Sequence, residues 1–185
     1  MMHKGMLWMS ALVLAATLAI AAPIRAQENS TQGYTFSVGI LRPTKSSVRA
    51  KTEDIWLSAN LGYTFRTSEP TDTGYYYQLG VSVGYYGSNS KKNIYNIPVL
   101  FTYTGHLNEQ FFYRAGAGIG FAKQYRNLEQ PSKGTKNTTG FAYSIELGYN
   151  FNTGTTPVAL TVGFAGVSGT DDQHTGLTAM LSFRF

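Results

Sequence analysis

The chain has 185 residues, of which only 14% are charged and 14% are aromatic, and its formal net charge is +5. An ordinary soluble domain carries roughly 25% charged residues, so this composition argues against a typical water-exposed surface. The sequence contains no cysteine, which excludes disulfides, a thiolate nucleophile and any metal site with cysteine ligands.

Residues 1–26 are predicted to be a secretory signal peptide. A short basic start with Lys4 leads into an apolar stretch over 11–22, and the small residue Ala26 precedes polar Gln27. Signal peptides have this order of charge, apolar core and small residues, and the apolar part is shorter than the ~20 residues of a membrane helix. We therefore expect an exported protein in which residues 27–185 form one domain.

The rest of the chain repeats one pattern, an alternation of apolar residues with polar or small ones. A period of two predicts β-strands, because successive side chains of a strand point to opposite faces. Residues that favour turns separate the segments. The eight predicted strands cover 34–41, 55–65, 75–86, 94–104, 111–122, 141–151, 158–165 and 177–185.

Two regularities distinguish a membrane barrel from a soluble sandwich. Nearly all in-strand glycines fall on the polar face, as expected where eight strands close around a narrow lumen. Aromatic pairs such as Tyr63 and Phe65 or Tyr75 and Tyr77 occupy strand ends on the apolar face, and aromatic girdles mark the two interfaces of a membrane. The prediction is an all-β fold, an eight-stranded antiparallel up-and-down transmembrane β-barrel.

The last strand places Leu181, Phe183 and Phe185 on one apolar face. This ending resembles the closing strand of bacterial outer-membrane proteins. The segments NIPVLFTY (96–103) and YRAGAGIG (113–120) are similar to segments common in the small outer-membrane β-barrel family related to OmpA and OmpX. The resemblance implies the outer membrane of a Gram-negative bacterium and recognition of the terminal residues by the barrel-assembly machinery. We expect a monomer without the peptidoglycan-binding domain of the OmpA type.

With both termini on the periplasmic side, the connections divide into two sets. The outer ones are predicted over 42–54, 87–93, 123–140 and 166–175, and the inner ones over 66–74, 105–110 and 152–157. The outer set holds ten basic and five acidic residues, a net charge of +5, whereas the inner side nets −3.

A basic outer rim suits a leaflet of phosphorylated lipopolysaccharide, although an ordinary solvated loop surface explains the same charges. The residues proposed to contact lipopolysaccharide or external partners are Lys45, Arg49, Lys51, Lys91, Lys92, Arg126, Lys133 and Lys136. Nucleic-acid binding is not expected, because no recognition motif accompanies these charges in an exported barrel.

Three charged residues, Arg114, Glu146 and Arg184, fall on the lumen face. The pairing of the fifth and sixth predicted strands brings Arg114 near Glu146, and an ion pair is expected because a lone buried charge is costly. This pair fits a plugged lumen, and the alternative is a narrow pore for ions or very small solutes. The other large inward residues that can occlude the lumen are Trp56, Tyr76, Tyr86, Phe112 and Met180.

Catalysis has little support. The best candidate cluster is Asp171, Asp172 and His174 with Ser168 nearby, which would suit a lipid A-modifying enzyme, another outer-rim hydrolase or a weak metal site. Loop acids beside a histidine are common, and His106 is assigned to an inner turn. We predict no catalytic residues, no metal and no cofactor. The preferred function is that of a structural or surface-interaction barrel, followed by a pore and then by an enzyme.

Overall fold

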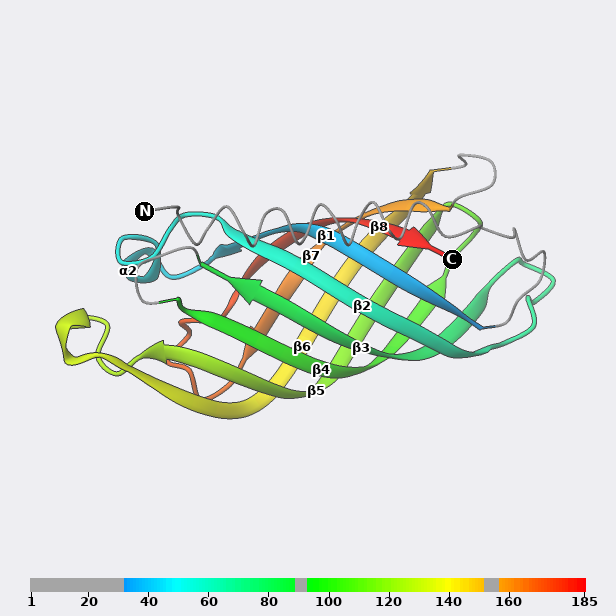
Figure 1. The fold of residues 1–185 in the computed structure, drawn as a ribbon. Helices are drawn as coiled ribbons and strands as arrows, with labels where there is room; N and C mark the ends of the chain where they lie inside the picture. Colours follow the sequence, from blue (N-terminus) through cyan, green and yellow to red (C-terminus); the bar gives the residue numbers. More distant parts are fainter. Residues whose placement is uncertain (1–31, 89–92, 152–156) are drawn as a thin grey trace.

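The alternating segments form eight β-strands that close into one antiparallel barrel, in which each strand pairs with the next and β8 returns to β1 (Figure 1). The computed structural model describes residues 32–88, 93–151 and 157–185, so the predicted signal segment 1–26 lies outside the described residues and stays a prediction. The strands are β1 (Gly33–Pro43), β2 (Trp56–Thr67), β3 (Tyr76–Gly87), β4 (Tyr95–His106), β5 (Phe111–Tyr125), β6 (Thr135–Phe151), β7 (Val158–Val167) and β8 (Gly176–Arg184). The predicted fold class is confirmed.

Two short helical segments accompany the strands: α2 (Ser46–Arg49) follows β1, and the 3-10 turn η1 (Pro131–Lys133) lies between β5 and β6. Neither was predicted from the sequence. Within the described ranges, no helix is long and apolar enough to cross a membrane.

The seam between β1 and β8 closes the barrel. The register places Val38 opposite Leu181 and Ser37 opposite Ser182, whose hydroxyl groups lie 2.7 Å apart inside the lumen. Beyond the last assigned pair, Tyr34 and Phe185 exchange two backbone hydrogen bonds of 2.8 and 3.0 Å. Closure satisfies the backbone groups that an open sheet would expose to lipid.

The exterior of the barrel is apolar. Ile145 and Leu147, for example, each expose 64% of their surface, and a continuous band of such side chains would be an aggregation hazard in water but is suited to lipid. We call the barrel end that holds Gly33 and Phe185 the inner end, and the opposite end the outer end.

Aromatic rings contact one another toward both ends of the apolar band. Pairs nearer the inner end are Tyr34–Tyr63 (4.9 Å between ring centroids), Tyr77–Tyr103 (5.7 Å) and Phe111–Tyr149 (5.1 Å). Pairs nearer the outer end are Tyr85–Tyr95 and Tyr143–Phe164, both at 6.2 Å. These contacts agree with two interfacial belts, where amphipathic rings are favoured, and the chain is therefore a transmembrane barrel by its own geometry.

The predicted connection over 123–140 was too long. The ladder between β5 and β6 continues past the pair Phe121 and Thr139 as far as Tyr125 and Thr135, so that only residues 126–134 connect the strands. Figure 1 shows this hairpin projecting beyond the other strands at the end where α2 lies. The added rungs are mostly polar on both faces. Outside the lipid a β-ladder needs no apolar face, and the alternation that predicts membrane strands is lost there.

Close approach of β1 and β8 makes Gly39 a sensitive position. A methyl group added there would meet the carbonyl oxygen of Ala179 and lie 2.6 Å from the Cα atom of Met180. We expect Gly39→Ala to lower the free energy of unfolding by roughly 1–3 kcal/mol, the usual cost of overpacking, in urea titrations of the refolded barrel. Gly62→Ala is the matched control, since its nearest neighbour atom would be 3.7 Å away. Equal effects of the two substitutions would contradict this account of the seam.

Candidate functional site

The outer half of the lumen is filled by a plug of buried, mainly apolar side chains. The plug residues are Leu41, Val48, Trp56, Tyr86, Ile94, Tyr125 and Ala165. Leu41, Trp56 and Tyr86 come from strands in which the alternation turns a large residue inward, whereas Val48 enters from α2. Large side chains at the same level of a narrow barrel leave little room for water, so the described structure separates the lumen from the outer end.

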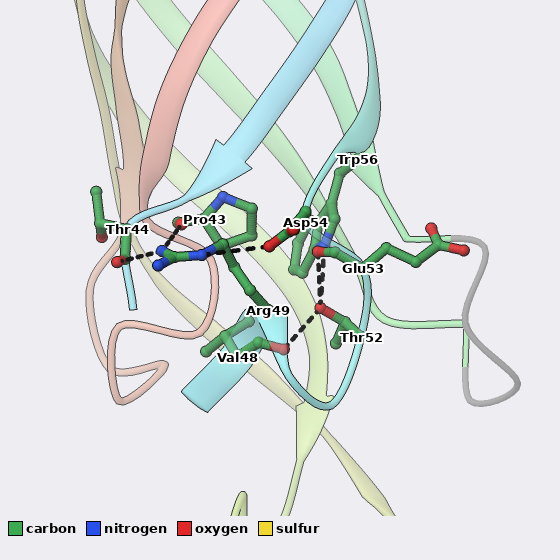
Figure 2. A network of polar contacts seen from close by, with 8 residues as sticks. All are labelled: Pro43, Thr44, Val48, Arg49, Thr52, Glu53, Asp54 and Trp56. Carbon is green, nitrogen blue, oxygen red and sulfur yellow. Dashed lines mark hydrogen bonds and ion pairs between the residues drawn. The ribbon is translucent and has the colours of Figure 1, made fainter. Parts of the chain in front are cut away.

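The loop between β1 and β2 is held over the plug by Arg49 (Figure 2). One terminal nitrogen of its guanidinium group donates hydrogen bonds to the carbonyl oxygens of Pro43 (2.7 Å) and Thr44 (2.6 Å), and its Nε atom lies 3.4 Å from a carboxylate oxygen of Asp54. Arg49 was predicted to bind partners at the surface. In the structure its hydrogen-bonding capacity is used largely within its own loop.

Trp56 anchors the same loop from inside the barrel. Its indole Nε1 donates to the hydroxyl oxygen of Thr52 at 3.2 Å, and that hydroxyl donates to the carbonyl oxygen of Val48 at 2.9 Å (Figure 2). The indole N–H, which would be costly to bury unpaired, therefore connects the plug to α2.

His174 packs against the plug and not within a reactive cluster. Its ring is 1% exposed and meets the ring of Trp56 edge-on, with centroids 5.4 Å apart. Asp171 and Asp172 are exposed, and the hydroxyl of Ser168 accepts a hydrogen bond from the backbone N–H of Phe141 at 3.0 Å. The residues considered for an outer-rim enzyme are thus not brought together. The described part of the chain also contains no group of three acidic or histidine side chains that could hold a metal ion.

The inner half of the lumen is different, because it contains a polar cavity of about 350 Å³. Arg114 and Glu146 face each other in the β5–β6 ladder, with a nitrogen–oxygen distance of 3.3 Å. Arg114 also donates to the hydroxyl of Thr104 at 3.3 Å, and its guanidinium lies 5.6 Å from the ring centroid of Phe112. The pair is therefore built into the cavity wall, with the Glu146 side chain only 4% exposed.

Arg184 also lines this cavity, but it does not join the pair. Among the described residues its guanidinium forms no ion pair, and the nearby charge of Arg114 repels it. The three lumen charges predicted from the sequence are therefore divided into one pair and one separate cation.

His106 was placed wrongly in an inner turn. It is the last residue of β4 and turns into the lumen, where its ring stacks on Tyr76 at 4.1 Å with an interplanar angle of 6°. Its Nε2 atom lies 3.3 Å from the side-chain oxygen of Gln78. Extending the even-numbered inward series of β4 by one step from Thr104 would have identified it.

Three basic residues of the outer rim line a groove of about 440 Å³. Lys45, Lys51 and Arg126 line it together with the acidic residues Glu129 and Asp171. Lys45 donates to the backbone oxygen of Asp171 at 3.1 Å, and Arg126 donates to that of Thr135 at 3.1 Å.

The remaining rim candidates lie elsewhere. Lys133 is exposed in η1 and Lys136 is exposed on β6. Lys136 reaches the Gln124 side chain at 3.2 Å when that amide is oriented to satisfy its neighbours. Lys91 and Lys92 lie outside the described residues. At the other end of the barrel, Phe183 and Leu181 pair with β1, and the role of these residues and Phe185 in assembly stays a prediction.

No protein-family model matches the chain, and none of the curated proteins matches it. Similar solved structures include the Yersinia pestis outer membrane protein Ail in a phospholipid bilayer nanodisc, with 15% identity, 83% of this chain and 99% of that chain covered, and a TM-score of 0.46. Ail from Yersinia pestis in complex with the heparin analogue sucrose octasulfate has 16% identity, 83% and 97% coverage, and a TM-score of 0.45. At these values the likeness carries no functional weight.

Burial of His174 predicts a pH-dependent stability. Desolvation lowers the pKa of its imidazole from 6.5 to about 4, while the nearby backbone of Lys123 offsets this in part. The unfolded chain therefore takes up a proton at a higher pH than the folded barrel does. Stability is lost as pH falls from 6.5 through 4, by up to about 3 kcal/mol for such a shift. Urea unfolding at pH 7 and pH 4 should show a smaller loss for His174→Gln than for the wild type, and parallel losses would contradict the assignment.

Proposed function

We propose that the protein is a monomeric outer-membrane barrel of the surface-interaction type, whose outer rim binds the phosphate groups of lipopolysaccharide. The observation that carries this proposal is the convergence of Lys45, Lys51 and Arg126 on one groove at the outer end. These cations come from two segments far apart in the sequence, the α2 loop and the β5–β6 connection. The barrel fixes their spacing before any partner arrives.

The height of the β5–β6 hairpin supports contact with lipid headgroups. Phe121, an exposed outward-facing ring near the outer end of β5, pairs with Thr139, and Lys136 lies three residues before Thr139, toward the outer end of β6. At about 3.4 Å per residue, this places the lysine backbone roughly 10 Å along the strand beyond the Phe121–Thr139 pair. Because the belt marks the interface, the basic residues of the hairpin fall at the level of the charged headgroups.

Charge balance in the groove is modest. Glu129 and Asp171 share it with the three cations, so that the formal excess is one positive charge. Because cations and carboxylates are interspersed in the groove, a phosphate group is attracted only where it lies next to a cation and is repelled where it lies next to a carboxylate. The groove therefore favours phosphate groups at particular positions over a uniform anionic surface. The acidic residues therefore supply selectivity within the proposed interaction.

The plug argues against the alternative of a continuous pore. Trp56 and Tyr86 are fully or almost fully buried at the outer half of the lumen, and Val48 of α2 belongs to the same buried cluster. A lipid A-modifying enzyme is disfavoured because His174 faces the plug and not the exposed Asp171 and Asp172.

Conductance measurements test the closed lumen. We expect the refolded wild-type barrel to give no discrete current steps in planar bilayers, whereas Trp56→Ala, which empties part of the plug, should give steps. Outward-facing Tyr85→Ala is the control and should stay silent. Folding is verified by the difference in gel mobility between unheated and boiled samples. Discrete steps from folded wild-type protein would favour the pore.

Binding of lipopolysaccharide tests the rim. The double variant Lys51→Gln and Arg126→Gln should bind lipopolysaccharide vesicles about thirtyfold more weakly at low salt, since each of the two lost phosphate contacts contributes on the order of 1 kcal/mol and each 1.4 kcal/mol is a factor of ten in affinity. The difference should shrink at high salt. Arg66→Gln, which removes an exposed cation from the inner side, is the control. Unchanged binding of the double variant would reject the proposed rim.

A further inference from the structure

We propose that the inner half of the lumen is a binding site for a small hydroxylated anion, such as a sugar phosphate or a hydroxy acid, which enters from the inner end of the barrel. This site is separate from the outer rim, and neither proposal depends on the other.

The shape of the cavity suits a small solute. Its volume of about 350 Å³ lies at the lower end of the range for small-molecule sites. Glu109 and Gln110, in the connection after β4, line it at the inner end, while the plug around Trp56 fills the outer half. A solute can thus reach the polar walls from one side only.

A cation that forms no ion pair with any described residue is the first recognition element. Arg114 is neutralised by Glu146 at 3.3 Å, whereas the guanidinium of Arg184 forms no ion pair within the described part of the chain. It lies in the same cavity wall and is partly buried. A partly desolvated guanidinium is stabilised by an oxyanion, which it can bind through two parallel hydrogen bonds.

Unpartnered polar atoms are the second element. The hydroxyl of Ser82, the side-chain oxygen of Asn60 and the Nδ1 atom of His106 are buried and have no hydrogen-bond partner among the residues that the structure describes. All three residues line the cavity. Ser82 and His106 are each only 6% exposed. Buried polar atoms normally have partners. The serine hydroxyl can donate to an anion, and the oxygen of Asn60 can accept from a solute hydroxyl, which is why the proposed ligand carries both groups.

Glu109 opposes the anion and therefore provides a diagnostic variant. It is exposed where the cavity reaches the inner end, so neutralising it should leave the fold intact and remove a repulsion. Arg184→Gln and Glu109→Gln should then change the affinity in opposite directions. A general disturbance of the barrel would not produce that result.

The experiment is a calorimetric titration of the refolded mature barrel in lipid nanodiscs. The probes are glucose 6-phosphate, gluconate and neutral glucose. We expect both anions to bind more tightly than glucose, with Arg184→Gln weakening them about tenfold, as loss of a charge-assisted hydrogen bond does. Glu109→Gln should tighten binding about twofold by relieving a partly screened repulsion. Arg126→Gln, at the outer rim, should leave affinity unchanged.

Several results would overturn the proposal. No binding of either anion by folded wild-type protein would mean that the cavity holds water alone. If glucose bound as tightly as the anions, Arg184 would not be the recognition element. If Arg126→Gln bound the anions more weakly than the wild type, the binding site would be at the outer rim and not in the lumen. Should Arg184→Gln fail to fold, Glu109→Gln and Ser82→Ala decide the matter: tightening by the first and weakening by the second are both required.

Discussion

The pairing of β8 with β1 is the constraint on which the rest of this structure depends. In lipid, no strand edge can be left without hydrogen-bond partners, so eight strands must close into a cylinder, and such a cylinder is narrow. Because the lumen is narrow, many inward positions must carry small residues, and only a few can carry large ones. At Gly39 even a methyl group would meet the backbone of β8, which shows how closely the seam strands approach.

Within this narrow cylinder, the chain divides the lumen into two environments. Large apolar side chains fill the outer half of the lumen, and the ring of His174 is buried against them in its neutral form. The Arg114–Glu146 pair lies in the inner half, where the cavity wall supplies further polar contacts such as Thr104. An ion pair gains little over apolar packing once desolvation is counted. Its position beside a polar cavity, rather than inside the plug, reduces that cost.

The alternation of residues was sufficient to predict eight strands, their closure and the facing positions of Arg114 and Glu146, because lipid on one side and a lumen on the other enforce a period of two. Where the chain leaves the membrane, that constraint disappears. The polar rungs of the β5–β6 hairpin and the four residues of α2 were therefore missed. His106 was missed because its strand continues past the last clear apolar position, and the lone status of Arg184 could not be predicted because it depends on three-dimensional distances.

The plug also decides with which compartment the lumen can exchange material. A channel open at both ends responds to the gradient across its membrane, and its contents are set by flux. With the closed lumen proposed here, in which Trp56 and its neighbours block the outer half, the cavity would have a single entrance, so its occupancy at equilibrium would depend only on the concentration at the inner side. A barrel closed in this way would present its outer rim to one compartment while its interior equilibrated solely with the other.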